Sequence, residues 1–143
     1  MFLGEFEHSL DAKGRIILPA RFRARLEGGC VLTKGQDGCL SVYPREEWER
    51  KAAAMSEASQ ADLRARNFVR LFFSGAHEEV PDKQGRVTIP EHLRRYAQLE
   101  REVQVIGSGT RFEIWDRQAW ESHRQSAERD YADIADVNPN LPF

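Results

Sequence analysis

The stretch Asp11-Ala12-Lys13-Gly14-Arg15-Ile16-Ile17-Leu18-Pro19 occurs a second time, 71 residues further on, as Asp82-Lys83-Gln84-Gly85-Arg86-Val87-Thr88-Ile89-Pro90. Both copies keep the Asp, the Gly, the Arg, the alternating apolar residues and the final Pro. Further along, Leu40-Ser41-Val42-Tyr43 matches Phe112-Glu113-Ile114-Trp115 in the same way. The 143 residues therefore contain two copies of one plan.

Each copy predicts a short strand, a turn that contains the glycine, and a second strand with period-two alternation. Arg15 and Arg86 are expected on the outer face of that second strand, at the mouth of the turn. Pro19 and Pro90 end the strand and suit the first turn of a helix. The apolar residues that share the inner face, and are expected in the core, are Ile16, Leu18, Val87 and Ile89.

A hairpin is expected after the helix of each copy, with turns over residues 35–38 and 107–110. The register places Cys30 opposite Tyr43 and away from Cys39. The expected facing pairs are Val31 with Val42 and Thr33 with Leu40 in the first hairpin, and Val103 with Ile114 and Val105 with Phe112 in the second.

The rest of the chain is predicted to be helical. The spacing of Trp48, Ala52 and Met55 predicts a helix within residues 45–70, which also include an apolar stretch around Leu63 and Phe68. A polar helix is expected from Trp120 to about Tyr131, before an acidic tail marked by Asp133, Asp136, Pro139 and Pro142. The expected segments are a first repeat unit (1–47), a helical connector (48–70), a second repeat unit (71–120), and a C-terminal helix with the tail (121–143).

The net charge of -2 excludes a uniformly basic surface but not a local one. Of the 21 basic residues, 17 are arginines, whose planar guanidinium suits phosphates and guanine edges. Residues 121–143 carry five acidic residues and two arginines, so this segment accounts for the negative total. No apolar run approaches the roughly 18 residues of a membrane span, and the first residues lack the pattern of a signal peptide. A cytoplasmic protein is expected.

The duplicated Asp-x-x-Gly-Arg loop is the strongest candidate for function. Its Asp can accept hydrogen bonds from loop amides or hold the Arg in place, and Arg21 and Arg23 are close by in the first copy. In a single copy, turn formation alone would account for the Asp and the Gly, with a solvated Arg. Duplication of an exposed Arg favours binding instead. The candidate DNA-binding residues are Asp11, Lys13, Gly14 and Arg15 in the first loop, and Asp82, Lys83, Gln84 and Arg86 in the second.

The sequence predicts neither an enzyme nor a metal or cofactor site. Cys30 and Cys39 lack the spacing of zinc ligands and are expected to stay thiols. No H-E-x-x-H, Walker, G-x-S-x-G or G-x-G-x-x-G pattern occurs. The tryptophans occupy matched positions, so core packing is favoured over stacking on bases; they are Trp48, Trp115 and Trp120.

These residues resemble the MraZ family of bacterial transcriptional regulators, which have two tandem SpoVT/AbrB-type domains. The resemblance rests on Met1-Phe2-Leu3-Gly4, on His8-Ser9-Leu10 before the first loop, on Phe73-Ser74-Gly75-Ala76, on both loops, and on Glu113-Ile114-Trp115. It implies an α+β fold, mostly β, in which two swapped-hairpin units interleave within one chain and carry flanking helices.

The resemblance also implies a homo-oligomeric ring that binds direct repeats in promoter DNA of a cell-division and cell-wall gene cluster, as a nucleoid-associated repressor. It makes Arg15 the residue that contacts DNA, with Arg86 at the equivalent position, and it implies a methyltransferase partner. Two other interpretations stay open. One is a protein-interaction module or antitoxin-like regulator that acts through a protein partner; the other, RNA binding by exposed aromatics, is disfavoured by the expected burial of the tryptophans.

Overall fold

Strands of the two copies are mixed in one six-stranded antiparallel sheet with the order β1-β7-β8-β4-β3-β5. The computed structural model describes residues 1–58, 61–137 and 140–141, without the side chains of 134–137. The strands of this sheet are β1 (Glu5–Ser9), β3 (Cys30–Lys34), β4 (Leu40–Pro44), β5 (His77–Glu79), β7 (Glu102–Ser108) and β8 (Arg111–Asp116). Strand β1 of the first copy pairs with β7 of the second, while β5 of the second copy pairs with β3 of the first. Each copy thus completes the sheet of the other, which confirms the interleaved swapped-hairpin fold.

A separate two-stranded ribbon is formed by β2 (Arg15–Ile17) and β6 (Arg86–Thr88). Ile16 lies opposite Val87, its own counterpart in the repeat, so an approximate two-fold axis passes through this pair. The same axis passes through the centre of the large sheet, where Ser41 lies opposite Glu113. The repeat in the sequence is therefore a two-fold symmetry in space.

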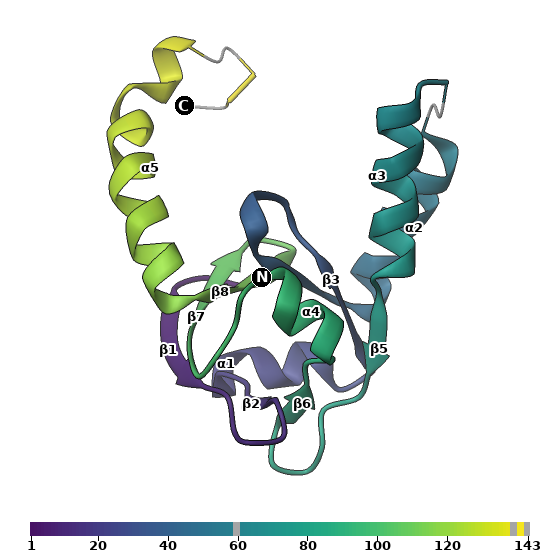
Figure 1. Cartoon of the computed structure of the whole chain (residues 1–143), viewed down its shortest axis with the longest axis vertical. Helices are drawn as coiled ribbons and strands as arrows, with labels where there is room; N and C mark the ends of the chain where they lie inside the picture. Colours follow the sequence, from purple (N-terminus) through teal and green to yellow (C-terminus); the bar gives the residue numbers. More distant parts are fainter. Residues whose placement is uncertain (59–60, 138–139, 142–143) are drawn as a thin grey trace.

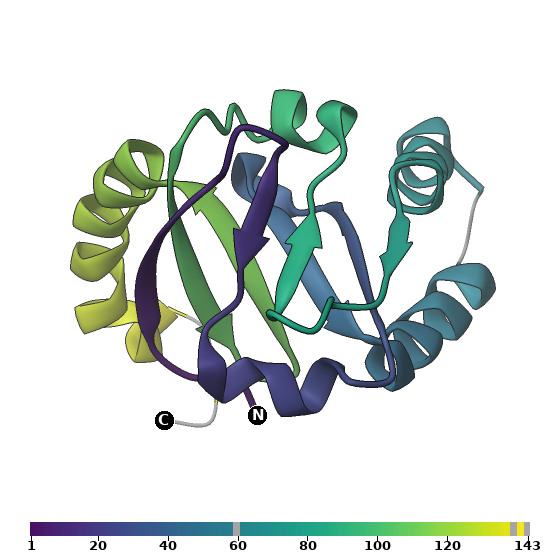
Figure 2. The same ribbon diagram turned by 90° about the horizontal axis from the view of Figure 1, so that it is seen from below.

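The core lies between the ribbon and the large sheet. Figure 2 shows β2 and β6 side by side in front of the sheet, with α1 (Ala20–Arg23) on one side of them and α4 (Glu91–Tyr96) on the other. Ile16 and Val87 are buried as expected, as are Leu18 and Ile89. The ring of Phe22 on α1 lies 4.9 Å from that of Phe2 and 5.1 Å from that of Phe112. Burial of such side chains stabilises a fold by about 1.5–3 kcal/mol each.

The longer helices extend from the sheet on the side away from the ribbon (Figure 1). They are α2 (Arg45–Glu57), α3 (Leu63–Ser74) and α5 (Arg117–Val137); two short 3-10 turns, η1 (Ala24–Leu26) and η2 (Gln36–Gly38), complete the described elements. Helices α2 and α3 pack together where Trp48 stacks on Phe72, with ring centroids 5.0 Å apart. Trp115 contacts Trp120 on α5 at 5.2 Å. These contacts agree with packing roles for the three tryptophans.

The expected registers of both hairpins are wrong. In the first, Val42 lies opposite Leu32 and Cys30 opposite Pro44, one residue away from the prediction. The loop between β3 and β4 extends to Cys39, one residue beyond the expected turn, because the Gly35 amide donates a hydrogen bond to the Cys39 carbonyl at 2.7 Å. Within this loop Asp37 adopts a φ of 63°. Strands β3 and β4 are buried on both faces, so alternation of apolar residues could not set the register.

The second hairpin is shifted by two residues. Ile114 pairs with Val105 and Asp116 with Val103, because β7 continues to Ser108 and β8 begins at Arg111. The turn is consequently shorter than the expected 107–110.

The helices also differ from the expectation. The helix expected over 45–70 is two helices, because Ala58 is extended and Asp62 caps α3 by accepting a hydrogen bond from the Ala65 amide at 2.8 Å. Helix α5 continues past Tyr131 and contains Asp133 and Asp136, while Pro139 and Pro142 lie outside the described residues. The division into segments 1–47, 48–70, 71–120 and 121–143 stays a prediction. Among the described residues, no helix combines the length and apolar composition needed to cross a membrane.

Candidate nucleic-acid interface

The first repeated loop is held by the carboxylate of Asp11. Its Oδ1 accepts hydrogen bonds from the backbone amides of Lys13 and Arg15, each at 2.9 Å. Its Oδ2 accepts from Nε of the Arg15 side chain at 2.7 Å. One side chain therefore fixes both the backbone of the turn and the guanidinium that follows it. This contact uses Nε and leaves the two terminal nitrogens of Arg15 outside it.

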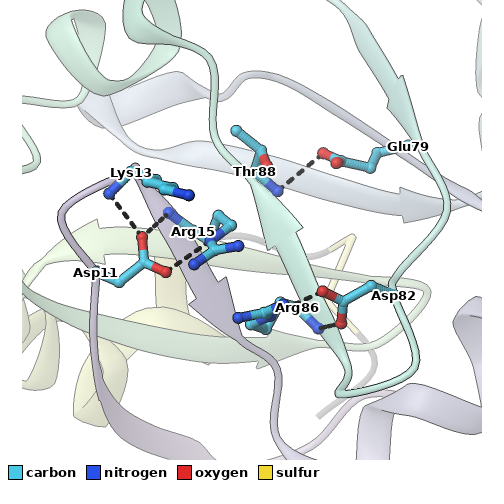
Figure 3. A network of polar contacts seen from close by, with 7 residues as sticks. All are labelled: Asp11, Lys13, Arg15, Glu79, Asp82, Arg86 and Thr88. Carbon is cyan, nitrogen blue, oxygen red and sulfur yellow. Dashed lines mark hydrogen bonds and ion pairs between the residues drawn. The ribbon is translucent and has the colours of Figure 1, made fainter.

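The second loop repeats this arrangement atom for atom (Figure 3). Asp82 accepts from the amides of Gln84 and Arg86 at 2.9 Å and from Nε of Arg86 at 2.8 Å. In both copies the aspartate thus accepts hydrogen bonds from the loop amides and also holds the arginine side chain, the two roles that were expected as alternatives.

Both carboxylates are stabilised in the ionised form. Hydrogen bonds from the backbone and side chain of Arg15 lower the pKa of Asp11, and those from Arg86 lower the pKa of Asp82 in the same way. The two arginines therefore keep charged partners at neutral pH.

The loop glycines have two structural reasons to be glycine. Gly14 and Gly85 have φ values of 75° and 77°, in the left-handed region that favours a residue without Cβ. In addition, a Cβ on Gly14 would lie 2.7 Å from Cζ of Arg94, and one on Gly85 would lie 2.4 Å from Nε of Arg23. Each loop is thus covered by an arginine from the helix of the other copy.

The ribbon aligns the two loops with each other. Beyond the paired strands, the Leu18 amide donates to the Gly85 carbonyl and the Ile89 amide donates to the Gly14 carbonyl, each at 2.9 Å. Figure 2 shows the loops at opposite ends of neighbouring strands. The outer face of the ribbon carries Arg15, Ile17, Arg86 and Thr88.

All eight residues named from the sequence lie in the two loops or at the first position of the strand that follows each loop. The ribbon joins the two loops through its pair of antiparallel strands. Lys13, Lys83 and Gln84 are exposed, while the side chains of Arg15 and Arg86 keep 28% and 27% of their surface accessible. Arg23 was expected beside the first loop, but its side chain covers Gly85 of the second loop; Arg94, which covers Gly14, was missed. The offset of 71 residues between the repeats places Arg94 at the position equivalent to Arg23, just as it places Leu93 at the position of Phe22.

The two cysteines, which were also considered as candidate ligands, are buried away from solvent. Cys30 and Cys39 are buried thiols, and burial raises the pKa of each to about 12. Within the described part of the chain, no group of three or more His, Cys, Asp or Glu side chains could hold a metal ion.

A six-stranded sheet of exchanged hairpins, closed by a ribbon with two Asp-held arginines, defines a tandem AbrB-like protein made of two units in a single chain. A family profile described as "MraZ protein, putative antitoxin-like" matches residues 1–71 and 72–136. The chain belongs to the MraZ family, which confirms the resemblance found in the sequence.

Curated relatives match over nearly the full length. The proteins named Transcriptional regulator MraZ from Salinispora arenicola (strain CNS-205) and Salinispora tropica are 55% and 54% identical over 142 residues, 99% of this chain and 100% of each relative. The protein of that name from Paenarthrobacter aurescens (strain TC1) is 52% identical over 138 residues, 96% of each chain. The relatives are thus named for regulation of transcription and not for an enzymatic reaction.

Proposed function

We propose that this protein is a sequence-specific DNA-binding transcriptional regulator that places the β2–β6 ribbon and its two loops in the major groove. The observation that carries the proposal is the duplicated Asp-held arginine on one exposed ribbon. The major groove of B-DNA accommodates a two-stranded β-ribbon, and arginine recognises guanine O6 and N7 through two hydrogen bonds. The remaining loop residues of the proposed site are Lys13, Gly14, Lys83 and Gln84.

The fixed position of the arginines favours specific binding. Because Asp11 and Asp82 already hold Arg15 and Arg86 through Nε, little side-chain freedom would be lost when the terminal nitrogens meet a base. A good bidentate contact contributes about 1–3 kcal/mol of discrimination between bases.

The local charge of this face also favours DNA. The loops and their covering helices carry more basic than acidic side chains. The basic residues are Lys13, Arg15, Arg21, Arg23, Lys83, Arg86, Arg94 and Arg95; the acidic residues are Asp11, Asp82 and Glu91, together with Glu79, which accepts a hydrogen bond from the Thr88 amide of the ribbon. A surface of this sign attracts phosphates even though the whole chain is slightly acidic.

The proposed assembly is a homo-oligomeric ring that binds direct repeats in the promoter of a cell-division and cell-wall gene cluster and represses it in the nucleoid. These points come from the family resemblance, as does a methyltransferase partner. The structure contributes one supporting feature. Helix α3 exposes Leu63, Phe68 and Leu71 to 57%, 46% and 52%, and a second copy could cover these side chains. Several weak ribbons in one ring would bind repeated sites with a higher effective concentration.

The test compares Arg15→Ala and Arg86→Ala with Arg50→Ala, a change at an exposed arginine on α2 that is not on the ribbon face. Binding to a duplex with the promoter's own repeats is measured by fluorescence anisotropy at several salt concentrations, and assembly by native mass spectrometry. Arg15→Ala should lose specific binding without a change in assembly, and Arg50→Ala should behave as the wild type. For the wild type, the logarithm of affinity should fall by about 0.9 for each phosphate contacted per unit of log salt.

The alternative is a protein-interaction module or antitoxin-like regulator, for which the exposed apolar face of α3 is the relevant observation. Wild-type affinity of Arg15→Ala for the promoter, together with a flat response to salt, would favour this alternative and contradict the DNA-binding proposal.

A further inference from the structure

The two loops have the same backbone but differ in chemistry at two turn positions, one of them directly before the glycine. Lys13 and Gln84 occupy equivalent sites, one residue before the left-handed glycine, and each donates its amide to the loop aspartate at 2.9 Å. Both side chains are exposed. Since the hydrogen bonds of the turn involve only their backbone, the fold does not distinguish the two residues.

The lysine of each loop is also displaced by one residue. The first loop has Ala12 before Lys13, whereas the second has Lys83 before Gln84. Each loop consequently carries the same net charge, and electrostatic attraction to phosphates is nearly equal at the two ends of the ribbon.

The nearly equal attraction of the two loops to phosphates matters because of the two-fold axis between Ile16 and Val87. Rotation about that axis exchanges Arg15 with Arg86 and one loop with the other. A protein two-fold axis matches the local two-fold symmetry of a DNA duplex, so the ribbon could enter the groove in either of two directions. Arginines, aspartates and net charge are the same in both directions and cannot select one.

Equivalent residues also differ at Ala12/Lys83 and Ile17/Thr88, but only Lys13 and Gln84 both carry side chains that can hydrogen-bond to a base edge, so this pair can select a direction. The lysine ammonium only donates hydrogen bonds, which suits the acceptors O6 and N7 of guanine. The glutamine amide has both a donor and an acceptor, which suits N7 and N6 of adenine. Lysine and glutamine therefore suit different bases.

We propose that Lys13 and Gln84 are specificity-determining residues that fix the direction of the chain on DNA, with guanine favoured under the first loop and adenine under the second. The inference rests on the proposed function, since it requires the ribbon to meet base edges. It gives a physical reason why direct repeats would be suitable sites: copies that all bind in one direction need sites that all point the same way.

The experiment is a selection of bound duplexes from a pool with a randomised centre. It uses the full-length wild type, the exchange variant Lys13→Gln/Gln84→Lys, and the single variant Gln84→Lys. The matched control, Lys51→Gln/Gln118→Lys, makes the same chemical exchange at exposed positions on α2 and α5. Arg15→Ala is selected in parallel to test the DNA-binding function separately.

The wild type is expected to select an asymmetric sequence, in which the base next to the arginine contact is guanine at one end and adenine at the other. The exchange variant should swap these two bases, with a change in preference on the order of ten- to a hundredfold at each position. Gln84→Lys should select guanine at both ends, and the control should select the wild-type sequence. A merely structural role for the two residues would change affinity but not the identity of the selected bases.

Two results would overturn the inference while leaving DNA binding intact: a symmetric sequence selected by the wild type, or an unchanged sequence selected by the exchange variant. Failure of the wild type to enrich any sequence, or an Arg15→Ala selection identical to that of the wild type, would instead overturn the proposed function and the inference with it.

Discussion

Replacement of Gly14 by alanine tests how the loops are built. The substitution adds a Cβ at a φ of 75°, where an L-residue costs about 1–2 kcal/mol relative to glycine. It also places that Cβ 2.7 Å from Cζ of Arg94, so the guanidinium from the other copy must move. Because the guanidinium is at the end of a flexible side chain, this second cost should be smaller than the first.

Two other glycines separate these contributions. Gly38 has a φ of 79°, and an added Cβ there would have no atom within 4 Å, so Gly38→Ala measures the backbone cost alone. Gly28 has neither feature, and Gly28→Ala should be neutral or stabilise the fold by up to about 1 kcal/mol. For a chain of this size, 1 kcal/mol corresponds to roughly 3 °C in Tm.

The assay is differential scanning calorimetry of the three variants, of Arg94→Ala and of Gly14→Ala/Arg94→Ala. We expect Tm to fall by about 3–6 °C for Gly38→Ala, since the backbone cost is about 1–2 kcal/mol, and somewhat further for Gly14→Ala. The double variant should be more stable than the sum of its single changes predicts, because the displaced side chain is absent. A Gly14→Ala protein as stable as Gly28→Ala would refute the backbone argument, and strict additivity in the double variant would refute the contact with Arg94.

Three further predictions concern the loops and the core. The pKa values of Asp11 and Asp82 lie below their ordinary value of 3.8, so the stabilisation of the loops should be fully present above about pH 4 and lost as pH falls through the lowered values. Amide NMR shifts of the loops, measured at acidic pH, should follow this loss. Loops that stay unchanged after both carboxylates have titrated would contradict the prediction. Burial raises the pKa of Cys30 and of Cys39 to about 12, so both thiols should resist Ellman's reagent at pH 8 in the folded protein and react in urea. Rapid reaction in buffer without urea would count against the burial of these thiols. Phe22→Ala, which removes a ring packed on Phe2 and Phe112, should lower the free energy of unfolding by about 3–5 kcal/mol in urea titrations, and a loss below 1 kcal/mol would mean that this cluster is not the core.

The repeat predicted the buried face of the ribbon strands and the interactions within the loops. Alternation around Ile16 and Val87 predicted which face is buried, and the residues of the loop predicted both roles of Asp11. The pairing of one copy with the other followed from the family resemblance and not from any local pattern, since contacts between residues far apart in the sequence leave no periodic signal.

The register of the hairpins could not be predicted from the alternation of polar and apolar residues. Val31, Leu32 and Thr33 are all fully buried, so neither face of β3 is marked by polar residues. The first connection further depends on a left-handed Asp37, a conformation that residue type alone does not specify. In the candidate site, Arg94 was missed because its role depends on the opposite copy, whose Gly14 it covers.

The pairing of β1 with β7 has a consequence for synthesis of the protein. Glu5 lies opposite Ile106, so β1 leaves the ribosome about a hundred residues before its neighbour β7. At 5–20 residues per second, the hydrogen-bonding edge of β1 stays without its native partner for roughly 5–20 s. At the opposite edge the delay is about half as long, because β3 pairs with β5 through residues such as Leu32 and His77. The amino-terminal strand is therefore the segment of the nascent chain that chaperones have most time to bind.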